Sequence, residues 1–162
     1  MSDATASAVL TALRARGWTL GVAESLTGGA VSSALVTVPG ASAVFLGGVV
    51  AYATPVKHTV LGVDADLLRR HGPVHPEVAR QMADGVRETV VVDERAADVG
   101  VSTTGIAGPE SPDGQPVGTV HVGVVTPTSS RTARFVFAGD RDAVRAQSVD
   151  AALEALLAAL RE

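Results

Sequence analysis

Cysteine is absent from this 162-residue sequence, and lysine occurs only once. Without cysteine the chain can form no disulfide, no cysteine-ligated zinc or iron–sulfur site and no thiol nucleophile. No apolar run approaches the ~20 residues of a membrane-spanning helix. The 13 basic and 17 acidic residues give a net charge of −4, whereas general nucleic-acid binders are basic. We therefore expect a globular cytoplasmic protein that binds neither nucleic acid nor membranes.

The single lysine, Lys57, lies five residues after the single tyrosine, Tyr52. One interpretation is a composition biased against lysine, in which Lys57 survives as an ordinary surface charge. The other is that Lys57 does something that arginine cannot. A partly buried lysine can lose its proton and act as a base, whereas arginine stays protonated.

Hydrophobic periodicity predicts alternating helices and strands. Helices are expected at 4–16, 30–36, 55–61 and 64–70, from 76 onward and at 140–160, and strands at 19–23, 47–52 and 98–103. Two further apolar segments, 117–126 and 131–138, flank a Pro-Thr-Ser-Ser connection that indicates an antiparallel hairpin. This order favours one domain over residues 1–162, an α/β fold with three layers (α/β/α) and a mixed sheet.

Small and polar residues follow the first predicted strand, including Ser25, Thr27, Gly28 and Gly29. The ends of strands in open α/β sheets are where ligands bind. Free N–H groups at the start of the next helix could hold a phosphate, a carboxylate or a developing oxyanion. The simpler alternative is that Ser25 or Thr27 caps the helix and that the glycines aid packing.

A serine nucleophile needs a base, and the four histidines show neither a triad pattern nor metal-ligand spacing. Tyr52 and Lys57, at the end of the second strand, are better candidates, because a desolvated lysine can take the serine proton. The alternative is a half-buried tyrosine beside an exposed lysine. The sequence predicts no metal site.

Two other positions carry candidate binding groups. Thr104 and Gly105 end the third strand and add a hydroxyl and a flexible backbone. Arg141 and Arg145 lie four residues apart on one face of the last helix, where they could bind a phosphate or carboxylate. The alternative is a solvated face that pairs with neighbouring acidic residues.

Six short motifs occur in an order that resembles the C-terminal domain of the competence-damage-inducible CinA family. They are ESLTGG (24–29), GGVVAY (47–52), LGV (61–63), TGIAGP (104–109), PVGTV (116–120) and GDR (139–141). Each motif alone is weak, but the ordered set is specific, and the likeness extends over residues 17–157.

The resemblance implies an amidohydrolase that deamidates nicotinamide mononucleotide to nicotinate mononucleotide and ammonia, with no metal or other cofactor. It implies a five-stranded mixed sheet and a homo-oligomer. By matching to the family motif, Ser25 is the nucleophile, and Tyr52 and Lys57 relay its proton. The small-molecule nucleotide would then contact Thr27, Gly28, Gly29, Thr54, Thr104, Gly105, Arg141 and Arg145.

The sequence departs from this family at Thr54, where many members carry asparagine. Threonine replaces only part of an amide's hydrogen-bonding capacity, so the departure bears on substrate preference. Two other functions stay open. One is a non-catalytic nucleotide-binding or interaction module linked to competence or DNA repair. The other is an amidase for a different small amide.

Overall fold

The computed structural model describes residues 2–162, apart from the side chain of Ser2. Within that range the helices are α1 (Ser2–Arg16), α2 (Ala30–Val36), α3 (Thr54–Thr59), α4 (Ala65–His71), α5 (Pro76–Thr89) and α6 (Arg141–Leu160), with a short 3₁₀ helix, η1 (Ala41–Ala43). The strands are β1 (Leu20–Glu24), β2 (Phe45–Val50), β3 (Val99–Gly105), β4 (Thr119–Val125) and β5 (Ser130–Val136). Each helix and strand expected from the sequence is present, with its ends shifted by no more than a few residues.

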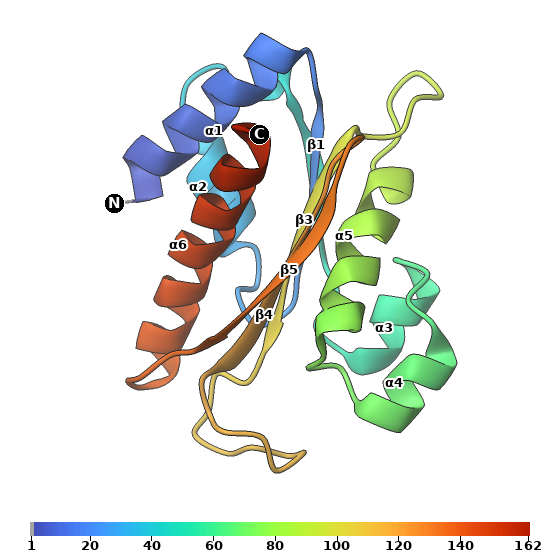
Figure 1. Cartoon of the computed structure of the whole chain (residues 1–162), viewed down its shortest axis with the longest axis vertical. Helices are drawn as coiled ribbons and strands as arrows, with labels where there is room; N and C mark the ends of the chain where they lie inside the picture. The colour runs from blue at the N-terminus through green and yellow to red at the C-terminus, as the bar shows by residue number, and fades with distance from the viewer. Residues whose placement is uncertain (1) are drawn as a thin grey trace.

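The strands form one mixed sheet in the order β2-β1-β3-β4-β5. Strand β1 is parallel to β2 and β3, while β4 is antiparallel to both β3 and β5. Because β1, β2 and β3 run in the same direction, their carboxyl ends lie at one edge of the sheet, with β1 in the middle. This edge is the lower one in Figure 1.

Helices cover both faces of the sheet. Figure 1 shows α1, α2 and α6 on one face and α3, α4 and α5 on the other, which confirms the predicted three-layer arrangement. The first face buries the larger apolar cluster, whose fully buried members include Leu10, Leu13, Val101, Leu153 and Leu156. Burying a leucine side chain is worth about 1.5–3 kcal/mol, so this cluster supplies a large part of the folding free energy.

On the other face, α5 packs closely against the sheet. Val78, Met82 and Val86 recur at the helical spacing seen in the sequence, and all three are fully buried. Glycines allow the close approach: a Cβ atom added to Gly100 would lie 1.7 Å from the carbonyl oxygen of Ala83. The start of α5 and the chain that precedes it are thereby held near the carboxyl end of β3.

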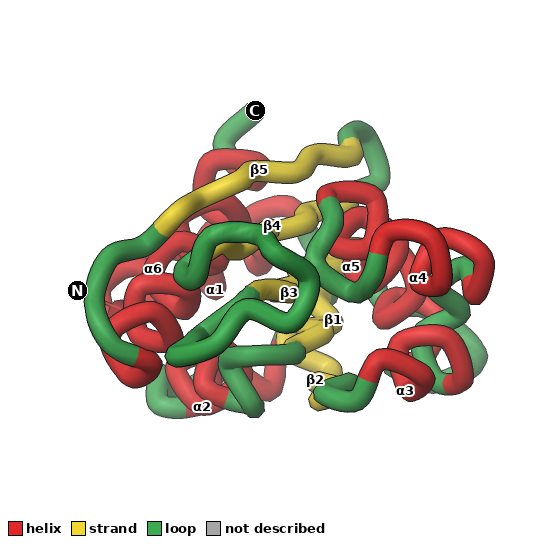
Figure 2. The backbone as a smooth tube through the Cα atoms, turned by 90° about the horizontal axis from the view of Figure 1, so that it is seen from below, coloured by secondary structure: helices red, strands yellow, loops and turns green. Residues whose placement is uncertain are grey.

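Loops gather at the carboxyl edge of the parallel strands. Figure 2, which looks onto this edge, shows them crossing the strand ends between the two helical layers. The longest of them, residues 106–118, joins β3 to β4. Across residues 2–162, no helix combines the length and apolar character needed to cross a membrane.

Candidate active site

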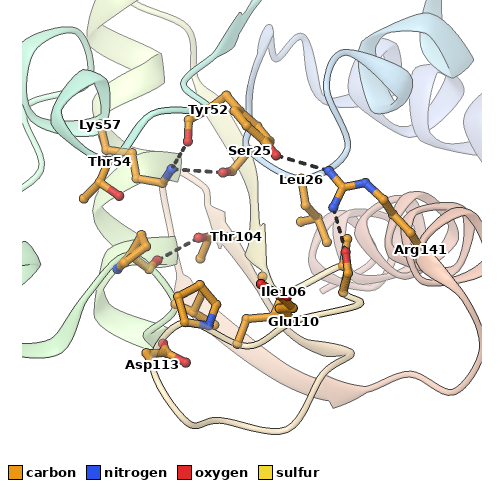
Figure 3. Close-up of a pocket in the computed structure, with 16 residues that line it drawn as sticks. Ser25, Leu26, Tyr52, Thr54, Lys57, Thr104, Ile106, Glu110, Asp113 and Arg141 are labelled. Carbon is orange, nitrogen blue, oxygen red and sulfur yellow. Dashed lines mark hydrogen bonds between the residues drawn. The ribbon is translucent and has the colours of Figure 1, made fainter.

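Chain segments from all three parallel strands meet around a cavity of about 380 Å³. Ser25 follows β1, Tyr52 lies two residues beyond β2, and Thr104 is the last residue but one of β3. All three line the cavity together with Lys57 of α3 (Figure 3). Ser25, Tyr52, Lys57 and Thr104 thus share one pocket, because parallel strands bring their carboxyl ends to the same edge of the sheet.

Lys57 is buried beside Ser25, with only 1% of its surface exposed. Its Nζ donates hydrogen bonds to Ser25 Oγ at 2.9 Å, to the carbonyl of Ala51 at 2.8 Å and to the carbonyl of Tyr52 at 3.3 Å. Burial disfavours the charged amine and lowers the pKa of Lys57 to about 8. The interpretation of Lys57 as a surface charge is therefore wrong, because α3 points this side chain inward.

The N–H groups that begin α2 are occupied by a carboxylate from the same chain. Glu24 is fully buried, and its oxygens accept hydrogen bonds from the backbone N–H groups of Gly29 at 3.0 Å, Val31 at 3.1 Å and Ser32 at 2.9 Å. The Ser32 hydroxyl adds a fourth bond at 2.9 Å. A buried carboxylate at a helix N-terminus accepts hydrogen bonds from the free N–H groups of the helix. Its negative charge also interacts favourably with the positive end of the helix dipole.

This arrangement corrects the assignment of Thr27, Gly28 and Gly29 as substrate ligands. None of the three lines the cavity. The Gly28 N–H donates to the Ser25 carbonyl, the Gly29 N–H is taken by Glu24, and the Thr27 hydroxyl pairs with a neighbouring β3 hydroxyl at 2.8 Å. The glycines serve the turn instead, with φ angles of 59° and 101° that suit glycine.

Two backbone donors beside the serine do remain free. Among the described residues, the N–H groups of Leu26 and Thr27 have no hydrogen-bond acceptor, and Leu26 lines the cavity. Unpaired N–H groups directly after a nucleophile are the kind of donor that stabilises an oxyanion.

Tyr52 does not pair with Lys57 through its phenol. The residue is 61% exposed, and its hydroxyl accepts a hydrogen bond from Arg141 Nη2 at 3.1 Å. Figure 3 shows the tyrosine ring directed toward Arg141, while Lys57 contacts only the tyrosine carbonyl. Among the described residues the phenol makes no hydrogen bond to Ser25 or Lys57, so its part in the predicted proton relay stays a prediction.

The remaining predicted ligands divide into two groups. Thr54, Thr104, Gly105 and Arg141 line the cavity, and Thr104 Oγ1 donates to the carbonyl of Pro73 at 2.7 Å. Arg145 does not line it. Its Nε donates to the Leu26 carbonyl at 2.9 Å, so this arginine supports the loop that carries Ser25 rather than facing a ligand.

Sequence reasoning missed several lining residues on the loop between β3 and β4. Ile106, Glu110, Pro112 and Asp113 all face the cavity. The Gly-Ile-Ala-Gly-Pro motif marked the start of this loop, but nothing in its polar continuation indicated that it folds back over Ser25. Among residues 2–162, no group of three or more histidine, aspartate or glutamate side chains could hold a metal ion.

The geometry suits acyl transfer. A serine hydroxyl lies within hydrogen-bonding distance of a buried amine with a lowered pKa, and free backbone donors follow the serine. A neutral lysine can take the hydroxyl proton as the oxygen attacks a carbonyl carbon. The arginine at the cavity wall adds a group that binds carboxylate or phosphate.

Comparisons with known proteins agree with this architecture. Residues 2–160 match the family described as the CinA C-terminal domain. A CinA-like protein of Frankia casuarinae is 44% identical over 152 residues, which are 94% of this chain and 34% of that protein. A putative competence-damage inducible protein of Desulforamulus reducens is 44% identical over 138 residues, 85% of this chain and 32% of that protein. The chain thus spans about a third of the length of these curated relatives.

Solved structures show the same fold. A competence-damaged protein (CinA) superfamily protein of Klebsiella pneumoniae superimposes with a TM-score of 0.92 at 35% identity, covering 99% of this chain and 98% of that one. The competence/damage inducible protein CihA of Agrobacterium tumefaciens superimposes with a TM-score of 0.90 at 32% identity, covering 99% and 96%. This chain belongs to the CinA C-terminal domain family.

Proposed function

We propose that this protein is a serine amidohydrolase that deamidates nicotinamide mononucleotide. The observation that carries the proposal is the 2.9 Å hydrogen bond between Lys57 Nζ and Ser25 Oγ in a buried environment. A lysine kept away from water can be neutral near physiological pH, which a base requires. The substrate is inferred from the family resemblance. The volume of the cavity and its charged lining residues are consistent with a nucleotide.

In the proposed reaction, Ser25 Oγ attacks the carboxamide carbon while its proton passes to Lys57 Nζ. The oxyanion is stabilised by the free N–H group of Leu26, which lines the cavity. The carbon–nitrogen bond breaks, and Lys57 returns the proton to the departing ammonia. Water then attacks the acyl-serine ester, again giving a proton to Lys57, and nicotinate mononucleotide leaves as Ser25 regains its hydrogen.

The cavity also fits the rest of the nucleotide. At about 380 Å³ it has the size of a small-molecule site. Arg141 donates to the Gly108 carbonyl at 2.8 Å and to the Tyr52 hydroxyl at 3.1 Å, so its guanidinium is held in place with further N–H groups left over. We propose that these bind the phosphate.

A substrate panel tests the proposal. Ammonia release is measured on nicotinamide mononucleotide, free nicotinamide and a set of other small amides, with and without a chelator, and nucleotide binding is measured in parallel. We expect release from the mononucleotide in both conditions. Release from a different amide alone would point to another amidase, and binding without release would point to the non-catalytic module.

A further inference from the structure

The cavity is lined by charged side chains of both signs. Lys57 and Arg141 are its basic residues, and Glu110 and Asp113, both on the loop between β3 and β4, are its acidic ones. Figure 3 draws the two acidic residues on the opposite side of the cavity from Ser25 and Lys57. A ligand that fills this space therefore meets positive and negative groups at separate places.

The two acidic residues are not equivalent. The Asp113 carboxylate accepts hydrogen bonds from the Gln115 N–H at 3.2 Å, from Gln115 Nε2 at 2.7 Å and from the Ser111 hydroxyl at 3.4 Å, so it stabilises its own loop. The Glu110 carboxylate has no hydrogen-bond or ion-pair partner among residues 2–162. Glu110 is thus the acidic group available to a ligand.

The loop that carries Glu110 is fixed on both sides. Before it, the Gly108 carbonyl accepts a hydrogen bond from Arg141 at 2.8 Å. After it, Gln115 Nε2 donates to the carbonyl of Val74 at 2.9 Å. The loop that bears Glu110 is therefore fixed beside the cavity by contacts to α6 and to the segment between α4 and α5.

We propose that Glu110 is a specificity-determining residue that favours substrates with a positively charged aromatic ring. The inference rests on the proposed function, because an oxidised pyridine mononucleotide carries a cationic ring and an anionic phosphate. Arg141 attracts the phosphate, while Glu110 offsets the repulsion that the basic groups of the cavity exert on the ring. A nucleotide with a neutral ring gains nothing from Glu110.

The test compares the oxidised and reduced forms of nicotinamide mononucleotide, which share carboxamide, ribose and phosphate but differ in ring charge. Binding of both is measured on a Ser25→Ala background, and turnover of the oxidised form is measured on the otherwise unchanged protein. Each experiment is repeated with Glu110→Gln and with Glu154→Gln. Glu154 is exposed on α6 away from the cavity, so its variant controls for overall charge.

We expect Glu110→Gln to weaken binding of the oxidised form about fivefold and to leave the reduced form unchanged, because one charge pair in a wet cavity has a modest effect. KM should rise while kcat stays constant, and the effect should shrink at high salt. Equal weakening of both forms, or of neither, overturns the inference. If the protein releases ammonia but Glu110→Gln has no effect, the role of Glu110 is disproved and the proposed activity stands. If Glu110→Gln weakens binding of the oxidised form only, but no ammonia is released, the proposed activity is disproved and the role of Glu110 in binding stands. If neither form binds, both fall.

Discussion

The Nζ atom of Lys57 lies 2.9 Å from the hydroxyl oxygen of Ser25, although 32 residues separate them in the sequence. The two side chains come from different elements, since Ser25 follows β1 and Lys57 belongs to the short helix after β2. Parallel pairing of β1 with β2 brings them together. Because Lys57 is almost completely buried, its proton affinity is set by the fold rather than by water.

If Lys57 is the base, removing its amine should abolish most of the activity. We expect Lys57→Met to lower kcat by about 10²–10⁴-fold, the usual contribution of a positioned acid or base. Methionine is linear and uncharged, whereas arginine would bring a larger, permanently charged group into a position that is 1% exposed. The measurement is steady-state turnover beside a thermal melt. A variant that folds and retains full activity would show that Lys57 is not the base.

The pH dependence should follow the same amine. Burial lowers the pKa of Lys57 to about 8, so kcat/KM should rise through about pH 8 and level off above it.

The free energy of unfolding should also rise with pH in the alkaline range. In the unfolded chain a lysine titrates near 10.4, so between about pH 8 and 10.4 the unfolded state binds more protons and the free energy of unfolding rises with pH. Lys57→Met should lack this rise in denaturant titrations. A parent protein whose activity falls across this window would contradict the assignment.

Tyr52 should matter much less than Lys57. Its hydroxyl contacts Arg141, and only its backbone carbonyl touches the lysine. We expect Tyr52→Phe to change kcat less than about tenfold, because losing one exposed hydrogen bond costs about 0.5–1.5 kcal/mol. The variant is compared with Lys57→Met in the same turnover assay. Equal losses of kcat in the two variants would show that the Tyr52 phenol takes part in proton transfer.

Glu24 should be important for stability. Its buried carboxylate accepts three backbone N–H bonds and one hydroxyl bond at the start of α2. We expect Glu24→Gln to lower the free energy of unfolding by about 1–3 kcal/mol, since an amide replaces one charged acceptor with a donor. Ser32→Ala, which removes only the hydroxyl bond, serves as the matched control and should cost less. Urea titrations measure both, and an unchanged midpoint for Glu24→Gln would disprove the capping role.

Much of this fold could be predicted from sequence because its signals are local. The spacing of Val78, Met82 and Val86 indicated α5, and the Pro-Thr-Ser-Ser connection indicated the β4–β5 hairpin. The strand ends that form the cavity were predictable for the same reason. Whether the chain forms a homo-oligomer stays a prediction.

The errors concern side-chain contacts, both near in sequence and far apart. Glu24 received no role from the sequence, yet its carboxylate occupies N–H groups at the start of α2, five to eight residues further on, where a ligand was expected. The direction of the Tyr52 ring depends on Arg141, which lies 89 residues away. Glu110 lies over the cavity because Arg141 and Val74 hold its loop. No local pattern encodes the contacts of Arg141 and Val74, which join segments more than 30 residues apart.

The proposed reaction depends above all on the attack of Ser25 on a nucleotide carboxamide. Simultaneous measurement of the ammonia and nicotinate mononucleotide formed from nicotinamide mononucleotide, by the parent protein and by Ser25→Ala, tests this attack. We predict equal amounts of the two products from the parent and a rate at the uncatalysed level from a folded Ser25→Ala protein that still binds the nucleotide. Undiminished product formation by that variant would contradict the account.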